Sequence, residues 1–389
     1  MTILYQKFET LLAHTTTNFK RYLFTKIAWD NRMIGIVGAR GVGKTTMILQ
    51  HIKENLNSKK ALYVSADDMY FAENRLIDLA ADFYKNAGEV LFIDEIHKYK
   101  DWSRELKNMY DSFPTLKIVF TGSSVLDIIH GSADLSRRAI IYELKGLSFR
   151  EYLKYFHNYE IDRYSLKQII HNDVKLTNIK HPLTLFKDYL KNGYYPFGRE
   201  SEMNLRLNQI IVQALETDIP QYANLNVGTS RKLKRLLSII AESVPFKPNF
   251  TKIAGMINVS RNSLDDYFSY MEKAGLIGQL RNETSGIRGL GKVDKMYLDN
   301  TNIIFNLVGD QSNVGNIRET FFFNQMRVNN EVISSKKAAF IIDDYTFEIG
   351  GKNKQQQQIE KDSTSFVVKD DIEFGYQNVI PLWAFGLNY

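Results

Sequence analysis

The stretch MIGIVGARGVGKTTMILQ, from Met33 to Gln50, decides the fold of this chain. It opens with a short apolar run at residues 34–37, which is typical of a buried strand. The next eight residues, GARGVGKT from Gly38 to Thr45, fit the P-loop pattern of glycines, a lysine and a hydroxyl at fixed spacing. Apolar residues then recur from Met47 to Ile52, which indicates one face of a helix. The order strand, glycine-rich loop, helix predicts a phosphate-binding loop.

Each part of this loop has a chemical task. Glycines let the backbone turn tightly so that its N–H groups point at phosphate oxygens, and the helix N-terminus adds a positive dipole end. Lys44 can reach the β- and γ-phosphates, and the Thr45 hydroxyl can ligate Mg²⁺. A glycine-rich turn with a chance lysine is the alternative, but it does not require a strand before and a helix after. The residues expected to hold the nucleotide are Gly38, Ala39, Arg40, Gly41, Val42, Gly43, Lys44, Thr45 and Thr46.

A second acidic element follows at the end of another apolar run, residues 89–93. Asp94 is predicted to hold Mg²⁺ through water, opposite Thr45. Glu95 is predicted to polarise the attacking water as a general base. An Asp-Glu pair by itself more often begins a surface loop, but its separation from the P-loop favours the catalytic interpretation.

The nucleotide is expected to be ATP. The guanine-reading NKxD tetrapeptide of GTPases is absent, and the glutamate beside Asp94 argues against a small-molecule kinase. A further apolar run, residues 116–120, ends in Thr121-Gly-Ser-Ser. Thr121 or Ser123 could sense the γ-phosphate, as a polar residue does at this place in additional-strand P-loop ATPases. A plain turn stabilised by a hydroxyl is an equally good explanation.

Composition bounds the remaining choices. The chain has 389 residues, 44% of them hydrophobic and 24% charged, which is ordinary for a globular protein of two to four domains. It has no cysteine, so disulfides and thiolate metal sites are excluded, and a cytoplasmic location is compatible. The first residues lack the order of a signal peptide, and no apolar run reaches the ~18 residues of a membrane span. A net charge of +6 permits contact with nucleic acid without arguing for it.

Four domains are predicted along the chain. Strands at 34–37, 61–64, 89–93, 116–120 and 139–144 alternate with helices, which predicts a parallel α/β sheet in residues 1–145. Residues 146–228 have helical periodicity. Residues 229–292 read as helix, short turn, N-capped helix and hairpin, which is a winged helix-turn-helix. Residues 293–389 alternate between strands and helices again.

The winged-helix segment leaves two roles open. Basic and amide side chains suited to DNA phosphates are expected on the N-capped helix and the hairpin. They are Arg261, Asn262, Lys273, Arg281, Arg288 and Lys292. Asp265, Asp266 and Glu272 on the same helix repel DNA. The segment is therefore either a DNA-binding element or a module that packs between domains.

The whole pattern resembles the bacterial and archaeal AAA-like ATPases related to the STAND branch. The resemblance rests on the segments GARGVGKTT, LFIDEIHK, FTGSS, DLSRR, GLSFREYL, NGYYPF and the tail FEIGGKNK to IPLWAFG. It implies an additional-strand P-loop sheet, a helical lid over the nucleotide, and Mg²⁺ as cofactor. Arg138 aligns with an arginine that approaches the phosphates in that family, although Arg137 replaces the glycine that usually precedes it.

Many members of that family end in a domain that resembles a degenerate restriction endonuclease. Here Glu319 aligns with its first acidic residue, but Ala339 replaces the catalytic aspartate and Gly350 replaces the lysine after Glu348. We therefore expect a structural, protein-binding or self-associating domain without nuclease activity. For the whole chain, three functions stay open: an ATP-hydrolysing switch, a nucleotide-gated DNA-binding regulator, and an ATP-bound scaffold with negligible turnover.

Overall fold

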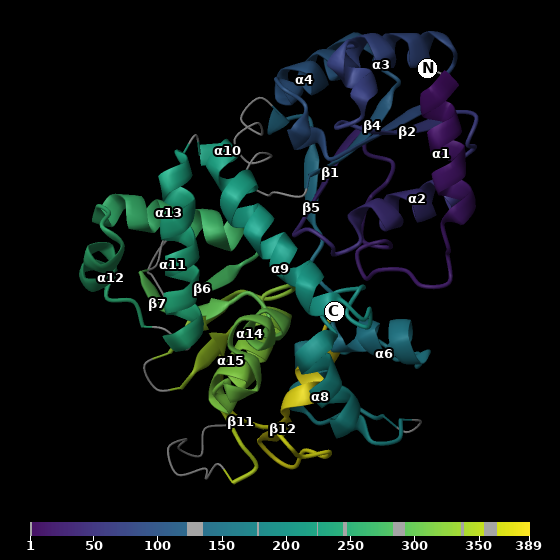
Figure 1. Ribbon diagram of the computed structural model, residues 1–389. Coiled ribbons are helices and arrows are strands. Elements are labelled where there is room, and N and C mark those ends of the chain that lie inside the picture. Colours follow the sequence, from purple (N-terminus) through teal and green to yellow (C-terminus); the bar gives the residue numbers. More distant parts are fainter. Residues whose placement is uncertain are drawn as a thin grey trace. The chain divides into compact units, whose positions relative to one another are not determined.

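The computed structural model describes residues 2–122, 135–176, 179–223, 225–243, 247–282, 292–335, 338–353 and 364–389 (Figure 1). Backbone contacts divide the chain into two compact units, Met1–Lys145 and Gly146–Tyr389. Among the described helices, none combines the length and the apolar character that crossing a bilayer requires.

The first unit is built on a five-stranded sheet. Its strands are β1 (Met33–Val37), β2 (Ala61–Ser65), β3 (Val90–Asp94), β4 (Lys117–Gly122) and β5 (Ile140–Glu143). They lie in the order β2-β3-β4-β1-β5, and every neighbouring pair is parallel. The predicted parallel α/β sheet is confirmed, with β4 inserted between β1 and β3.

Helices cover both faces of this sheet (Figure 1). They are α1 (Thr2–His14), α2 (Lys44–Asn55), α3 (Leu76–Lys85) and α4 (Trp102–Ser112), with short 3₁₀ turns η1 (Met69–Ala72) and η2 (Ile96–Lys98). Contacts join α1 to α2 and α3 to α4, so that each pair forms one layer. Strands β1 and β3 are buried along their whole length, as parallel strands covered on both faces must be.

The second unit begins with helices. They are α6 (Phe149–His157), α7 (Leu166–Ile170), α8 (Pro182–Asn192), α9 (Met203–Gln213) and α10 (Ile219–Ala223), with a π-helical turn η3 (Ala214–Asp218) between the last two. Ser148 begins α6 with a capping box, in which its hydroxyl accepts from the backbone N–H of Glu151 and the Glu151 carboxylate accepts from that of Ser148. The helical character predicted for this region is therefore observed.

Three helices and a hairpin follow. They are α11 (Val227–Ser243), α12 (Phe250–Ile257), α13 (Arg261–Lys273), β6 (Ile277–Arg281) and β7 (Val293–Leu298). Asn258 ends α12 in the left-handed region at φ 53°, and the Ser260 hydroxyl caps α13 by accepting from Ser263 N. Strand β7 pairs antiparallel with β6, although the domain boundary predicted at 292/293 separates the two.

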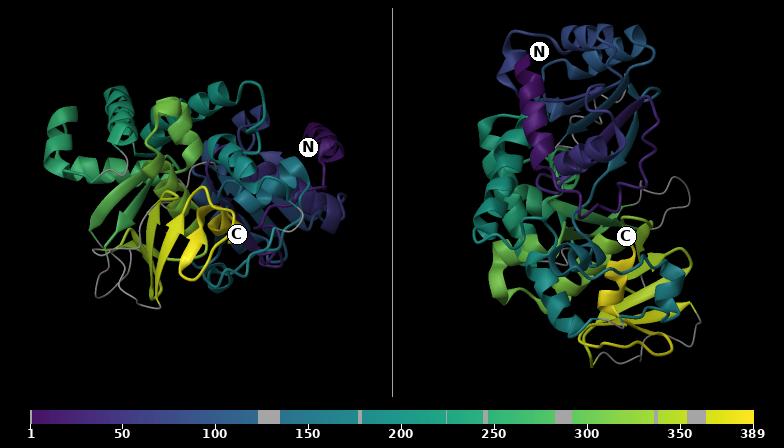
Figure 2. Two further views of the ribbon diagram at one scale, coloured as in Figure 1. Left: turned by 90° about the horizontal axis from the view of Figure 1, so that it is seen from below. Right: turned by 90° about the vertical axis from the view of Figure 1, so that its right-hand side faces the viewer.

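The last segment combines α14 (Thr301–Val308), the 3₁₀ turn η4 (Gly309–Gln311) and α15 (Val314–Met326) with a second five-stranded sheet. Its strands are β8 (Val332–Ser334), β9 (Phe340–Ile342), β10 (Tyr345–Gly350), β11 (Ser365–Lys369) and β12 (Val379–Pro381), in the order β12-β11-β10-β9-β8. Strands β10 to β12 are parallel and appear side by side in yellow tones in Figure 2, whereas β8 to β10 are antiparallel.

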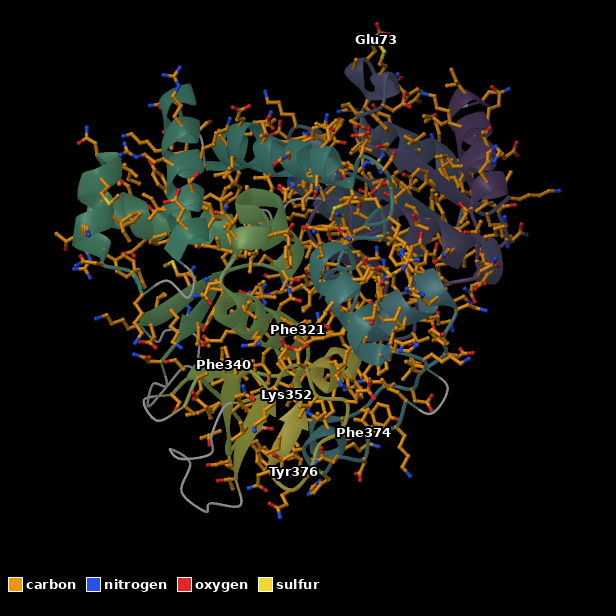
Figure 3. All side chains as sticks on the ribbon, turned by 60° about the horizontal axis from the view of Figure 1, so that its bottom comes forward. Glu73, Phe321, Phe340, Lys352, Phe374 and Tyr376 are labelled. Carbon is orange, nitrogen blue, oxygen red and sulfur yellow. The ribbon has the colours of Figure 1, made fainter. Side chains whose placement is uncertain are left out.

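The end of the chain forms a buried 3₁₀ turn, η5 (Leu382–Leu387). The Phe322 ring on α15 packs against Phe340, Phe347 and Phe385 with centroid distances of 5.0, 5.3 and 4.7 Å. The aromatic end of the chain is therefore part of the core of this segment. Figure 3 also shows Phe374 and Tyr376 in the segment before β12, where both rings are exposed.

Candidate nucleotide-binding site

The P-loop leaves β1 at the edge of the sheet where the parallel strands end. Gly38 has φ +152°, and a Cβ placed there would lie 2.2 Å from the carbonyl oxygen of Leu144, so no other residue fits. Gly43 is left-handed at φ 95° and directly precedes α2. The two glycines thus let the backbone pass close to the chain after β5 and then turn into the helix.

Arg21 holds the loop from outside and was not identified from the sequence. Its guanidinium is buried and donates to the carbonyls of Val42 and of Lys145, the latter at 2.6 Å. These two carbonyls belong to the P-loop and to the residues after β5. Arg21 therefore ties together two segments that border the predicted phosphate site.

Lys44 is the first residue of α2, and its side chain turns back over the loop. It is only 5% exposed, and its Nζ donates to the carbonyls of Gly38 at 2.8 Å and of Ala39 at 3.0 Å. Thr45 and Thr46 follow in the first turn of α2. The predicted loop residues are therefore contiguous around one helix N-terminus.

Asp94 is the point on which the other side chains converge. Its Oδ2 accepts from the Thr45 hydroxyl and from the Tyr63 hydroxyl, each at 2.6 Å. Its Oδ1 accepts from the Thr121 hydroxyl and from the backbone N–H of Glu95. The register explains the arrangement, because Asp94 pairs with Ser65 on β2 and Thr121 lies near the end of neighbouring β4.

Tyr63 is a further residue that sequence reasoning missed. Burial, and then the adjacent Asp94 charge, raises the pKa of its hydroxyl well above its usual range. Tyr63 therefore remains protonated and acts as a donor to Asp94. In the sequence Tyr63 is an aromatic residue in an apolar run. Its position beside Asp94 becomes evident only from the pairing of β2 with β3.

Glu95 has a left-handed backbone, with φ 51° and ψ 39°. Such a conformation is uncommon for a residue with a side chain and is concentrated at functional sites. One carboxylate oxygen, Oε2, lies 3.5 Å from His97 Nε2 and 4.0 Å from Arg40 Nη1. Its N–H also lies 3.1 Å from the Thr121 hydroxyl oxygen. Glu95 is thus beside the P-loop through Arg40 and beside Thr121 through its backbone.

The structure does not bring Arg138 to this edge. Arg138 precedes β5, whereas the P-loop follows the opposite end of neighbouring, parallel β1. Its guanidinium forms a two-bond pair with Asp111 at the end of α4, with both distances 3.0 Å. The expectation that Arg138 approaches phosphates is therefore not met by its position in this chain. Ser123, the alternative to Thr121, lies outside the described residues.

The residues singled out by the nuclease resemblance lie on α15 and β10. On α15, Glu319 accepts from the Tyr297 hydroxyl at 2.7 Å and pairs with Lys295 at 3.4 Å. Glu348 lies on β10, and Lys352 follows the end of that strand (Figure 3). In the part of the chain that the structure describes, no group of three or more histidine and acidic side chains could hold a metal ion.

The donor set at the P-loop fits a magnesium nucleotide. Mg²⁺ prefers hard oxygen ligands and is usually bound by one or two protein groups together with phosphates. The Thr45 hydroxyl and the Asp94 carboxylate offer such oxygens 2.6 Å apart. The glycine backbone, the α2 N-terminus and Lys44 supply the positive surroundings that phosphates require.

Comparisons with known proteins agree with this geometry. Residues 30–153 match the family described as AAA domain, and residues 183–313 match a domain of unknown function. The first segment contains the P-loop, Asp94 and Glu95, so the match to the AAA domain family includes the site described above. The second match runs from α8 to the turn before α15 and crosses both domain boundaries predicted within that region.

Individual relatives are distant. An uncharacterized protein of Methanocaldococcus jannaschii is 26% identical over 267 residues, which cover 63% of this chain and 56% of that protein. The chain thus spans about half the length of this relative. A Walker-type ATPase of Pyrococcus abyssi is similar in structure with a TM-score of 0.43 at 13% identity, covering 72% of this chain and 91% of that one. DnaA from Aquifex aeolicus gives a TM-score of 0.25 at 14% identity, covering 70% and 87%.

Proposed function

We propose that this protein binds ATP with Mg²⁺ and hydrolyses it, and that the nucleotide cycle switches its interaction with a protein or nucleic-acid partner. The observation that carries the proposal is the meeting of Thr45, Tyr63 and Thr121 on the carboxylate of Asp94, next to the P-loop. Asp94 and its three partners come from four different segments of the chain. A fortuitous motif match within one segment would not bring them together. The cytoplasm is the expected compartment.

Binding uses the loop and its lysine. The backbone N–H groups of residues 38–45 and the N-terminus of α2 would hold the β- and γ-phosphates. Lys44 would exchange its bonds to the Gly38 and Ala39 carbonyls for bonds to phosphate oxygens, where its charge offsets that of the nucleotide. Arg21 keeps the loop in place during this exchange, because it holds the carbonyl of Val42.

The metal would be held by Thr45 directly and by Asp94 through water. When bound, Mg²⁺ would supply positive charge that offsets the negative charge developing on the phosphates during transfer. Tyr63 and Thr121 donate to different oxygens of Asp94, so the carboxylate cannot rotate freely. Their role in this proposal is to keep Asp94 facing Thr45.

Glu95 is the proposed general base. Its carboxylate would accept a proton from the attacking water, and Thr121 at the end of β4 would contact the γ-phosphate. His97 and Arg40 lie within 3.5 and 4.0 Å of the carboxylate oxygen and would fix its direction. Glu95 directly follows β3, beside the strand that carries Thr121, so in this proposal water is the nucleophile that the protein orients.

The direct test is phosphate release from ATP by the purified full chain. We expect turnover that requires Mg²⁺ and stops when EDTA is added, together with binding of a fluorescent ATP analogue. Tight binding with no phosphate release, with and without DNA, would instead identify the ATP-bound scaffold. Absence of both binding and release would contradict the proposal.

The contact between Tyr63 and Asp94 gives a separate prediction. In Tyr63→Phe, the carboxylate loses one donor but retains Thr45 and Thr121. We expect the Mg²⁺ concentration for half-maximal turnover to rise about threefold to tenfold, the scale of one hydrogen bond to a charged group. A magnesium titration at saturating ATP measures this. Tyr84→Phe, which removes a hydroxyl that bonds Thr115 away from the site, is the control and should leave the titration unchanged.

A nucleotide-gated DNA-binding regulator is the second candidate. It is favoured by the arrangement of α12, α13 and the β6–β7 hairpin, in which the capped N-terminus of α13 exposes Arg261 and Asn262. Asp265 and Asp266 are exposed on the same helix and would oppose DNA. The Arg261 guanidinium also lies 5.8 Å from the Phe250 ring, so part of this side chain packs on the protein.

If this module binds DNA, its affinity should fall steeply as salt rises, because lysine and arginine contacts release counterions. Arg261→Glu should weaken binding to every sequence alike. Fluorescence anisotropy with short duplexes at several salt concentrations measures both effects. Arg206→Glu, a charge reversal on α9, is the matched control. No binding at low salt, or a flat salt response, would assign the module to packing between domains.

A further inference from the structure

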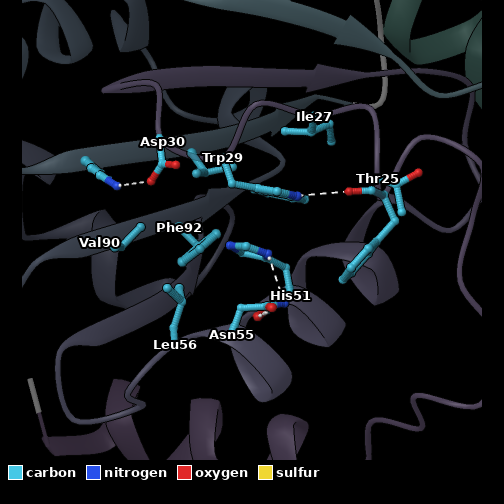
Figure 4. Close-up of a pocket in the computed structure, with 12 residues that line it drawn as sticks. Thr25, Ile27, Trp29, Asp30, His51, Asn55, Leu56, Val90 and Phe92 are labelled. Carbon is cyan, nitrogen blue, oxygen red and sulfur yellow. Dashed lines mark hydrogen bonds and ion pairs between the residues drawn. The ribbon is translucent and has the colours of Figure 1, made fainter.

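The first unit contains a cavity at the edge of the sheet opposite the P-loop (Figure 4). Its volume is about 480 Å³, within the range of small-molecule sites, ~300–1,000 Å³. Its walls come from the end of α2, the segment before β1, and the first residues of β3 and β4, where Val90 and Lys117 lie. Since Lys44 begins α2 and Asn55 ends it, the two sites share one helix.

The interior of this cavity is aromatic. The Trp29 indole stacks on the His51 imidazole with centroids 3.7 Å apart and planes 9° apart, and Phe92 is fully buried behind them. Burial, and secondarily the positive charge of Lys117, lowers the pKa of His51 to about 4, while Asp30 and Glu54 act weakly in the opposite direction. The imidazole is therefore neutral at pH 7, and the interior carries no charge that an apolar group would have to displace.

The mouth carries one charge of each sign. Lys117 Nζ lies 3.0 Å from Asp30 Oδ1 (Figure 4), with the Lys117 side chain 38% exposed and that of Asp30 fully exposed. An ion pair exposed in this way contributes little to stability, so its members can change partners at small cost. An anion that approached Lys117 alone would be repelled by Asp30, and a cation that approached Asp30 alone would be repelled by Lys117. A ligand that carries both charges satisfies both residues.

We propose that this cavity binds a hydrophobic zwitterion, namely an α-amino acid with an aromatic side chain. The ring enters the cavity beside the stacked pair of Trp29 and His51, the carboxylate pairs with Lys117, and the ammonium pairs with Asp30. This site is distinct from the nucleotide site, and its ligand contacts the far end of the P-loop helix.

The test is isothermal titration calorimetry of the full chain with L-phenylalanine, 3-phenylpropanoate and 2-phenylethylamine. The last two compounds keep the ring and carry a single charge each. We expect saturable binding of phenylalanine at one site per chain and at least about tenfold weaker binding of both analogues, the scale of one charge-assisted contact. No saturation by phenylalanine up to 20 mM, or equal binding of the three compounds, would overturn the proposal.

Substitutions at the cavity test whether phenylalanine binds there. Lys117→Met should remove the preference for phenylalanine over 2-phenylethylamine, and Asp30→Asn should remove the preference over 3-phenylpropanoate. Thr25→Trp, an exposed lining position, should fill the mouth and abolish binding of all three. Lys85→Met, at the exposed end of α3, is the charge-matched control and should bind like the natural chain. Unchanged binding in both Lys117→Met and Thr25→Trp would place the ligand elsewhere and refute the site.

Discussion

Replacing Lys44 with alanine should lower ATP turnover by at least about 100-fold, the scale on which one preorganised electrostatic contact contributes to catalysis. The lysine is buried against the Gly38 and Ala39 carbonyls, so its ammonium already lies over the loop that would receive the phosphates. Alanine is a good helix former at the start of α2, and the fold should therefore persist. Phosphate release and binding of a fluorescent ATP analogue measure the loss.

Lys53→Ala is the matched control for this variant. Lys53 lies on the same helix and also donates to backbone carbonyls, those of Leu12, Ala13 and Thr15. Lys53→Ala therefore tests whether activity is lost whenever a lysine of α2 that donates to backbone carbonyls is removed. We expect Lys53→Ala to bind and hydrolyse ATP normally at temperatures where it is folded. Wild-type nucleotide affinity and hydrolysis in Lys44→Ala would refute the proposed site.

The sheet that carries this site could be predicted because its signals are local. Each of its five strands is a short apolar run, and the P-loop fixes the position of β1 and α2. Strands β1 and β3, which are buried on both faces, need such uninterrupted runs, whereas the edge strand β5 is mostly exposed. Asp94 and Thr121 could be predicted for the same reason, since Asp94 ends β3 and Thr121 lies one residue before the end of β4.

The residues that support the site could not be predicted, because their roles arise from pairing between distant segments. Tyr63 reaches Asp94 because β2 lies beside β3, and Arg21 reaches Val42 because the segment before β1 folds back over the loop. No sequence motif around Tyr63 or Arg21 indicates either contact. His97 stands two residues after Glu95, whose backbone is left-handed, and the two side chains lie 3.5 Å apart, which the sequence does not indicate.

Arg138 shows how a family pattern can miss a position. The resemblance aligns it with a phosphate-binding arginine, but Arg138 lies in the turn before β5, and the strand residues Ile140–Glu143 separate it from the P-loop. They run from the edge at Asp111 to the edge at the P-loop. The second sheet was predicted least well, because β8, β9 and β12 have three residues each and too few for an alternating pattern.

Replacing Glu95 with glutamine should separate binding from chemistry. Glutamine keeps the size of the side chain but cannot accept a proton from water, so hydrolysis should fall roughly 100-fold or more, the scale of general-base loss. ATP affinity should remain, because the P-loop, Lys44 and Asp94 are untouched. Equilibrium binding of ATP and single-turnover phosphate release, measured on the same preparation, should therefore show trapped nucleotide.

Two further variants make this result specific. Glu89→Gln changes the acidic residue at the other end of β3, where Glu89 pairs with Lys60, and should hydrolyse ATP normally. Asp94→Asn should instead weaken the dependence of binding on Mg²⁺, because Asp94 is the carboxylate that faces Thr45. Glu95→Gln that hydrolyses at the natural rate would show that Glu95 is not the base. His97 and Arg40 would then orient a carboxylate with no part in proton transfer, and the left-handed backbone at Glu95 would have to be explained by the packing of η2 alone.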